Sequence, residues 1–241
     1  MGSRCGGPWL RAVVVVCACA GCGPTVPIEE TATQASSTVA VEAPVYRREA
    51  TDAVPRIVVL GDSLTAGLGL SPEEAYPAKL QEALDAAGYR LRVVDAGVSG
   101  DTTAGGLRRL EWALEGDVRI LIVALGGNDG LRGLPVEQMK DNLNQIVTTA
   151  ADRGIQVLLA GMEAPPNFGA AYTERFRRVF RDLGTEHEVI VVPFLLEGVA
   201  GLPELNQPDG IHPNAEGAAR VATHLWSALE PMLATTAGDV N

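Results

Sequence analysis

A serine, a histidine and an aspartate in this sequence have the types and spacing that nucleophilic catalysis requires. Ser63 follows a short apolar run, and Asp209 and His212 lie three residues apart much later in the chain. A serine hydroxyl is a weak nucleophile that needs a base, commonly a histidine oriented by an acid. Asp209 is near enough in the chain to meet the ring of His212 and fix its tautomer. The sequence therefore predicts Ser63 as nucleophile, His212 as base and Asp209 as orienting acid.

Three further groups could stabilise the oxyanion that forms when such a serine attacks an acyl carbon. The amide of Ser63 can point toward that oxygen, Gly97 offers an N–H without a side chain in the way, and Asn128 offers its side-chain NH₂. Removing one donor of this kind typically costs a factor of about 10²–10³ in rate. We expect an oxyanion hole made of Ser63, Gly97 and Asn128.

Each segment also has a simpler interpretation. Gly-Asp-Ser at 61–63 could cap a helix, Gly-Gly-Asn-Asp at 126–129 is ordinary turn chemistry, and Asp-x-x-His at 209–212 occurs by chance. Their joint occurrence at the ends of successive apolar runs favours the catalytic interpretation. No Gly-x-Ser-x-Gly elbow occurs, which disfavours the ordinary α/β-hydrolase arrangement.

The remaining histidines and two aspartates are weaker candidates. His187 stands just before an apolar run and His224 lies in an amphipathic stretch, so both are expected to be structural or surface residues. Asp101 and Asp129 are expected to hold loops. No two histidines have metal-ligand spacing, and all four cysteines lie within the first 22 residues. We therefore expect neither a metal nor an organic cofactor.

The elements that must position these residues alternate between strand and helix. Continuous apolar runs indicate strands covered on both faces of a parallel sheet, and the intervening stretches are helical, which predicts a doubly wound α/β sandwich. The expected strands are 57–60, 91–94, 120–125, 157–160 and 189–192, and the expected helices are 76–87, 103–114, 135–151, 172–183 and 215–229. In such folds the site lies beyond the carboxyl ends of the strands, where the candidate residues occur.

The front of the chain has a different composition from the rest. Residues 1–22 resemble a secretory signal of the bacterial lipoprotein type, with Cys22 as the expected lipidation site and Cys19 as the competing one. Residues 23–54 are rich in Pro, Thr, Ser, Ala and Glu and are expected to be a disordered tether. A catalytic domain at 55–232 and a flexible tail at 233–241 complete the expected organisation.

The net charge of −11 limits the partners of the chain. A surface this acidic repels phosphate backbones, and no basic cluster occurs, so nucleic acid is excluded as an expected partner. We expect neutral or acyl substrates, membrane contact through the N-terminal lipid, a monomer, and a periplasmic or cell-envelope location in a bacterium.

Together these segments resemble the SGNH (GDSL) hydrolase family. Ser63, Gly97, Asn128 and His212 match its four naming residues, and Asp209 matches its triad acid. The stretches 61–67, 96–106, 125–133, 161–169 and 193–199 are similar to the bacterial thioesterase I/arylesterase/lysophospholipase L1 branch, and the likeness covers about residues 56–230. The lipoprotein-like front departs from that branch.

The resemblance implies a flavodoxin-like sheet of five parallel strands in the order 2-1-3-4-5. It also implies an esterase that accepts fatty acyl thioesters, aryl esters and lysophospholipids, without a cofactor. A segment similar to the substrate loop of the branch contains Met162, Pro165, Pro166, Asn167 and Phe168. Two alternatives remain: a carbohydrate O-acetyl esterase with the same triad, and a non-catalytic surface lipoprotein that keeps the fold as a binding module.

Overall fold

The structure is a computed structural model that describes residues 54–236. The expected signal (1–22), nearly all of the expected tether (23–54) and both lipidation candidates, Cys22 and Cys19, lie outside the described residues. The fold below therefore concerns the region that carries the catalytic candidates.

Five parallel strands form one sheet in the order β2-β1-β3-β4-β5, which confirms the predicted topology. The order reverses at β1, so β1 has β2 on one side and β3 on the other. Ligand sites in such sheets lie outside the carboxyl ends of the strands at this reversal. The strands are β1 (Arg56–Gly61), β2 (Arg92–Gly97), β3 (Val118–Ala124), β4 (Gln156–Ala160) and β5 (Ile190–Val192).

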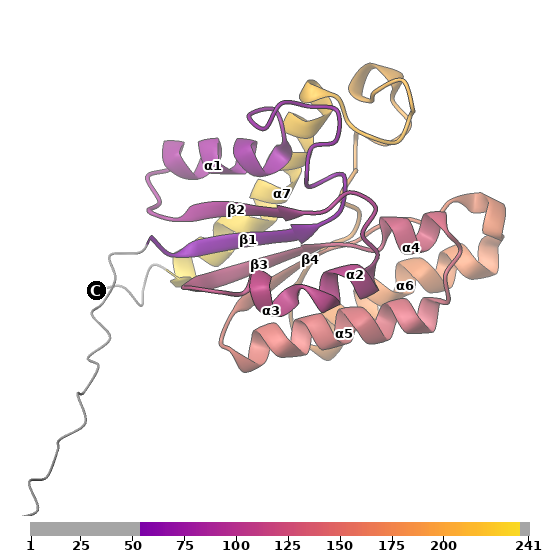
Figure 1. Cartoon of the computed structure of the whole chain (residues 1–241), viewed down its shortest axis with the longest axis horizontal. Helices are drawn as coiled ribbons and strands as arrows, with labels where there is room; N and C mark the ends of the chain where they lie inside the picture. The colour runs from indigo at the N-terminus through magenta and orange to yellow at the C-terminus, as the bar shows by residue number, and fades with distance from the viewer. Residues whose placement is uncertain (1–53, 237–241) are drawn as a thin grey trace, which may run out of the picture. The chain divides into compact units, whose positions relative to one another are not determined.

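Helices cover both faces of the sheet (Figure 1). On one face α1 (Tyr76–Ala86) packs against α7 (Ala215–Thr236). On the other face α5 (Val136–Asp152) packs against both α2 (Thr103–Arg108) and α6 (Ala170–Glu186). The short helices are α3 (Leu110–Ala113), α4 (Gly127–Leu131) and the 3₁₀ turns Pro166–Phe168 and Pro203–Leu205.

The apolar runs become buried strands because helices exclude water from both sides of the sheet. The side chains at 57–60 in β1 and 120–123 in β3 are at most 1% exposed. The amphipathic helix α5 buries Met139, Leu143, Ile146 and Ala150, which recur at helical spacing on the face turned to the sheet. This core fixes the strand ends from which the candidate residues project.

Several elements differ from the sequence prediction in their bounds or their type. The expected helix at 103–114 is two helices, α2 and α3, separated at Arg109. A helix that was not expected, α4, begins at the second glycine of the Gly-Gly pair after β3. The expected tail at 233–241 begins too early, because α7 continues to Thr236 and Leu233 is fully buried.

Candidate active site

The nucleophile turn, residues 62–70, leaves the carboxyl end of β1 and presents Ser63 at the sheet edge. Two backbone hydrogen bonds close it. The amide of Ala66 donates to the carbonyl of Asp62 (3.0 Å), and the amide of Leu68 donates to the carbonyl of Ser63 (3.0 Å). A side chain at Gly61 would place its Cβ 1.8 Å from Thr65 Oγ1. The tight exit from β1 therefore requires glycine.

Ser63, His212 and Asp209 form a continuous chain of hydrogen bonds. Ser63 Oγ lies 2.8 Å from His212 Nε2, and His212 Nδ1 lies 2.7 Å from Asp209 Oδ2. An ionised carboxylate only accepts hydrogen bonds, so the proton of a neutral imidazole sits on Nδ1. Nε2 is then free to accept the serine proton. The structure brings together all three residues of the predicted triad.

The Asp209 carboxylate is held in its ionised form. Its Oδ1 accepts hydrogen bonds from the backbone amides of His212 (3.0 Å) and Ile211 (2.9 Å). These amides, and then the His212 ring, lower the pKa of Asp209 to about 2. Asp209 therefore stays negative at every pH at which the protein would work.

A short hairpin, residues 205–214, fixes Asp209 and His212 relative to each other. The amide of Gln207 donates to the carbonyl of His212 (2.7 Å), and the amide of Asn214 donates to that of Leu205 (2.9 Å). Because the tip of this histidine hairpin carries both residues, their contact depends on local structure.

Gly97 does not occupy the predicted oxyanion position, and the prediction for this residue is wrong. Gly97 is the last residue of β2, and its amide donates to Asp95 Oδ1 at 2.7 Å. A Cβ at Gly97 would lie 2.3 Å from the backbone nitrogen of Ala66. Gly97 thus allows the nucleophile turn to pack closely on β2. The sequence prediction ended this strand at Val94, three residues too early.

Gly100, three residues beyond the end of β2, is the glycine of this segment that lines the cavity. It belongs to a turn closed by the hydrogen bond from the amide of Asp101 to the carbonyl of Val98 (3.0 Å), and it has a φ of +83°, which favours glycine. Gly100, Ser63 and Asn128 line the same cavity. Within residues 54–236, the amides of Ser63 and Gly100 have no hydrogen-bond partner. Both N–H groups are available to an oxyanion.

The side chain of Asn128 is oriented by two acceptors. Its Nδ2 donates to Asp62 Oδ2 (3.1 Å) and to the carbonyl of Asp101 (2.9 Å). These bonds identify the nitrogen end of the amide and fix it at the wall of the cavity that Ser63 also lines. An oxyanion would accept a hydrogen bond from the same Asn128 N–H that donates to Asp62 when no substrate is bound.

Asp62 is a buried carboxyl beside the nucleophile, and its side chain was not predicted to matter. The residue is 3% exposed, and burial raises its pKa from 3.8 to about 6. Hydrogen bonds from the amide of Leu64 and the side chain of Asn128 oppose this shift. Asp62 and Asp209 therefore differ strongly in pKa although both flank the Ser63–His212 pair.

Two other aspartates hold loops, as predicted. Asp129 accepts from the amide of Thr103 (2.9 Å) and from its hydroxyl (2.7 Å), which joins α4 to the start of α2. Asp101 pairs with Arg109 at 2.7 Å. The same guanidinium donates to the carbonyl of Gly61 (2.8 Å) and that of Ala96 (2.7 Å). Arg109 thereby ties together the ends of β1 and β2.

The two remaining histidines stand outside the hydrogen-bonded triad. His187 Nε2 lies 2.7 Å from Asn144 Oδ1, and His224 Nε2 lies 3.1 Å from the carbonyl of Phe194. Each ring has a partner on a neighbouring element, which agrees with the structural role expected from the sequence.

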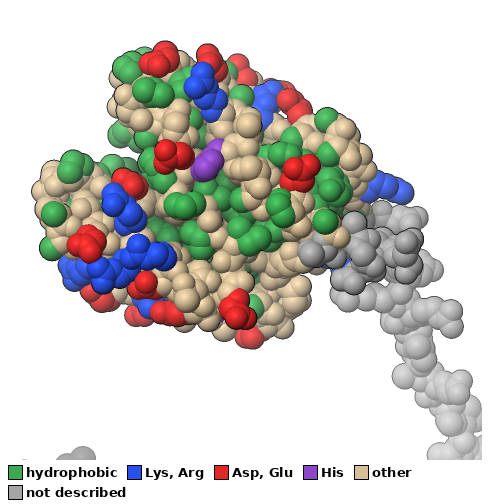
Figure 2. Space-filling model, turned by 180° about the vertical axis from the view of Figure 1, so that it is seen from behind, with side chains coloured by type: hydrophobic (Ala, Val, Ile, Leu, Met, Phe, Trp, Pro, Cys, Tyr) green, Lys and Arg blue, Asp and Glu red, His purple; other side chains and the backbone are tan. Residues whose placement is uncertain are grey.

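The triad opens into a cavity of about 620 Å³. Leu68, Leu131 and Ile211 form part of its wall and are nearly half exposed, which makes the mouth apolar. On the face seen in Figure 2, hydrophobic side chains gather around a histidine, with acidic side chains nearby. The cavity is lined by residues that include Ser63, Leu64, Leu68, Ser99, Gly100, Asn128, Leu131, Met162, Pro165, Pro166, Phe194, Ile211 and His212.

The predicted substrate loop is divided by the structure. Met162, Pro165 and Pro166 line the cavity. Asn167 and Phe168 are not part of its wall, and the ring of Phe168 packs on that of Tyr172 at 5.4 Å between centroids. Only the first part of this loop, as far as Pro166, therefore contributes to the cavity wall.

Between Val54 and Thr236, no helix is both long enough and apolar enough to cross a membrane. The same range contains no cluster of three or more His, Cys, Asp or Glu residues placed to hold a metal ion.

The raised pKa of Asp62 predicts a pH-dependent stability. The folded state binds a proton at this carboxyl more tightly than the unfolded state, so Asp62 makes the free energy of unfolding fall as pH rises from about 4 to 6. The shift corresponds to about 3 kcal/mol. Asp62→Asn removes this titration, so the variant does not lose stability over this range as wild type does. The free energy of unfolding of the variant minus that of wild type should therefore rise by about 2–3 kcal/mol between pH 4 and pH 8. Urea denaturation across this range measures the difference, and a pH-independent difference contradicts the assignment.

Comparison with known proteins supports one family. Residues 59–220 match the GDSL-like lipase/acylhydrolase family. Esterase TesA of Pseudomonas aeruginosa is 42% identical over 182 residues, covering 75% of this chain and 90% of that protein. Thioesterase 1/protease 1/lysophospholipase L1 of Escherichia coli is 36% identical over 182 residues, covering 75% and 86%.

Solved structures agree with this relationship. The crystal structure of TesA is 42% identical and covers 73% of this chain and 98% of that one, with a TM-score of 0.70. The esterase EstA from Pseudoalteromonas, solved in a form inhibited by monoethylphosphonate, is 32% identical and covers 74% and 98%, with a TM-score of 0.71. With the family match, the sheet order and the hydrogen-bonded serine and histidine in agreement, the chain belongs to the GDSL-like lipase/acylhydrolase family.

Proposed function

We propose that the protein is a serine hydrolase that cleaves carboxylic esters and thioesters through an acyl-enzyme on Ser63. The observation that carries this proposal is the chain of hydrogen bonds from Ser63 through His212 to Asp209, at the wall of an open cavity. The relatives named esterase, arylesterase and thioesterase/lysophospholipase support the same reaction class.

The first half of the reaction forms the acyl-enzyme. Ser63 Oγ attacks the acyl carbon while His212 Nε2 takes its proton, and the ionised Asp209 stabilises the resulting imidazolium. The carbonyl oxygen becomes an oxyanion that the amides of Ser63 and Gly100 and the side chain of Asn128 stabilise. His212 then returns the proton to the departing alcohol or thiol, and the tetrahedral intermediate collapses.

The second half releases the acid. Water attacks the acyl carbon on Ser63 as His212 Nε2 takes one of its protons, and the same donors stabilise the second oxyanion. Collapse breaks the bond to Ser63 Oγ, which recovers its proton from His212. Every proton in this cycle moves through one imidazole, so both halves of the reaction depend on the position of that ring.

An acyl substrate fits the cavity better than a carbohydrate does. Leu64, Leu68, Leu131 and Met162 offer apolar surface next to Ser63, and burial of apolar surface stabilises a bound chain by about 25 cal/mol per Å². A volume of about 620 Å³ exceeds what an acetyl group needs. Both features favour medium or longer acyl chains over the O-acetyl groups of the carbohydrate esterase alternative.

The N-terminal sequence supports a further proposal about location. We infer that the chain is exported and lipidated at Cys22, with Cys19 as the alternative, and that a tether links the lipid to the catalytic domain in the periplasm or cell envelope. These residues lie outside the described range, so the inference rests on sequence pattern. Mass spectrometry of the mature N-terminus should find a diacylglyceryl-modified cysteine. An unmodified Cys22, or a mature chain that begins after it, overturns lipidation there.

Substrate chain length provides the main test of the function. A soluble protein beginning near residue 50 should hydrolyse p-nitrophenyl esters with a maximum at medium chain length, because the apolar cavity binds the chain. Ser63→Ala should abolish this activity. Activity confined to the acetate would favour the carbohydrate O-acetyl esterase, and equal turnover by wild type and Ser63→Ala would exclude a serine hydrolase.

Asn128 tests the oxyanion assignment separately from the nucleophile. Asn128→Ala removes one donor and should lower kcat by a factor of about 10²–10³, with a much smaller change in KM, because the bond strengthens in the transition state. Asn167→Ala is the matched control, since Asn167 stands outside the cavity wall. Steady-state kinetics on one ester measures both variants. An equal loss in the two, or a loss confined to KM, contradicts the role of Asn128.

A further inference from the structure

The catalytic hydrogen bond joins two segments that are far apart in the chain. Ser63 belongs to the nucleophile turn and His212 to the histidine hairpin, 149 residues later. Local structure fixes His212 relative to Asp209, but it cannot fix His212 relative to Ser63. A separate interaction must set that distance.

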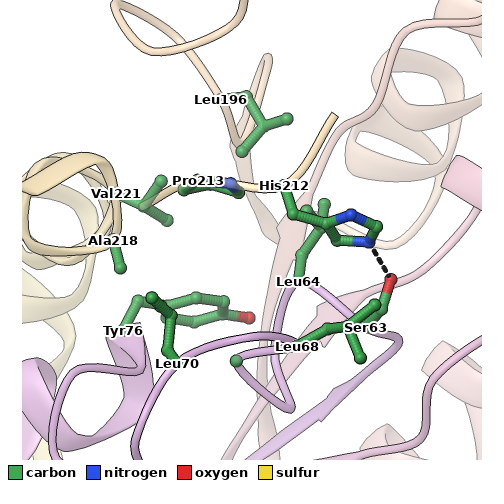
Figure 3. Close-up of a pocket in the computed structure, with 11 residues that line it drawn as sticks. Ser63, Leu64, Leu68, Leu70, Tyr76, Leu196, His212, Pro213, Ala218 and Val221 are labelled. Carbon is green, nitrogen blue, oxygen red and sulfur yellow. Dashed lines mark hydrogen bonds between the residues drawn. The ribbon is translucent and has the colours of Figure 1, made fainter. Parts of the chain in front are cut away.

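Packing beneath the Ser63–His212 pair is incomplete. A cavity of about 10 Å³, with room for about one water molecule, lies between the two segments. Figure 3 shows Ser63 and His212 on one side of this cavity, with Tyr76, Ala218 and Val221 on the other. A gap at this point leaves the side chains on either side without the close contacts that would hold the two segments in register.

The side chain of Gln207 connects the two segments directly. Its Nε2 donates to the carbonyl of Leu68 in the nucleophile turn (2.7 Å) and to that of Pro213 in the histidine hairpin (2.9 Å). The two N–H bonds of one planar amide therefore hold both backbones at once. Among residues 54–236, the other hydrogen bond between these segments is the catalytic one, Ser63–His212.

The backbone of the nucleophile turn is shaped to receive this amide. Gly69 follows Leu68 and has a φ of +81°. A Cβ at Gly69 would lie 2.2 Å from Gln207 Oε1. Glycine thus serves two needs here, a left-handed backbone and close contact with the Gln207 side chain.

We propose that Gln207 is a positioning residue that sets the Ser63–His212 distance. It acts through the backbone on both sides of the pair and is not part of the wall of the 620 Å³ cavity. The proposal rests on the proposed function, because it assigns Gln207 to the proton-transfer step of that reaction. Without Gln207, the triad residues remain but the bond from Ser63 Oγ to His212 Nε2 lengthens or becomes intermittent.

Substitution of Gln207 by methionine tests the proposal. Gln207→Met nearly keeps the volume and removes both donors, and Gln145→Met is the control because the Gln145 side chain is exposed and bonds to Asp141 of its own helix. At 25 °C, with circular dichroism showing both variants folded, Gln207→Met should lower kcat about 10–100-fold and change KM less than about twofold. A purely structural role predicts lower stability with kcat unchanged in the folded enzyme, and that outcome overturns the proposal.

A second variant approaches the same contact from the other segment. Gly69→Ala should displace the Gln207 amide and lower kcat in the same direction. If both substitutions break one contact, the double variant should be no slower than the slower single variant. If the fold-loss of kcat in the double variant equals the product of the two single losses, the two residues act separately and the proposal is overturned.

A spectroscopic measurement separates this proposal from the proposed function. ¹⁵N NMR of the His212 ring reports whether Nε2 accepts a hydrogen bond and needs no substrate. Gln207→Met should shift the Nε2 signal toward that of Ser63→Ala, and Gln145→Met should leave it in place. If wild type hydrolyses no ester, the proposed function fails, while the NMR result still decides the role of Gln207. An unchanged His212 signal in Gln207→Met overturns the proposal.

Discussion

The hydrogen bond between Ser63 and His212 is the contact on which the proposed reaction depends. It spans 149 residues at a donor–acceptor distance of 2.8 Å, so the whole domain must deliver two backbones to one place. The parallel sheet provides the coarse placement, because the segments after β1, β2 and β3 emerge at one edge. Finer placement comes from hydrogen bonds at that edge, where Arg109 joins two strand ends and Gln207 joins the two catalytic segments.

Two carboxyl groups beside this bond have opposite environments. The exposed Asp209 accepts two backbone amides and the histidine ring, which keeps it ionised and suits it to stabilise an imidazolium. The buried Asp62 has its pKa raised to about 6 while it orients Asn128. Two carboxyl groups whose environments separate their pKa values often have different roles in an active site. In the proposed mechanism Asp209 orients the base, and Asp62 orients the side chain proposed as an oxyanion donor. Because burial raises the pKa of Asp62, its ionisation lowers the stability of the folded protein.

The five strands and the pairing of Asp209 with His212 could be predicted because they depend on local pattern, whereas the strand order came from the family resemblance. Apolar runs punctuated by glycine located the five strands, and the spacing of Asp209 and His212 placed the acid beside the base. The oxyanion glycine was misassigned because the last residues of β2, through Gly97, are only partly apolar, so the strand seemed to end at Val94. The candidate that we propose instead, Gly100, lies just beyond the observed end of the strand, in a left-handed turn.

Contacts between distant segments were beyond what the sequence could predict. Nothing in the neighbourhood of Gln207 indicates that its amide meets Leu68, since that bond depends on the packing of two loops 139 residues apart. Burial of Asp62 and of Leu233 likewise depends on what covers them in the fold. Local chemistry can therefore nominate catalytic residues, but the residues that align them require the three-dimensional structure.

Covalent modification by an aryl alkylphosphonate reports whether Ser63 is a nucleophile that His212 activates. Ser63 Oγ should displace the aryl alcohol and retain one phosphonyl group, because the histidine takes its proton and the oxyanion donors hold the phosphoryl oxygen. Intact-protein mass spectrometry with peptide mapping should show one added group, on Ser63, and His212→Ala should react far more slowly. Modification at another residue, or equal rates in wild type and His212→Ala, would contradict a Ser63 nucleophile activated by His212.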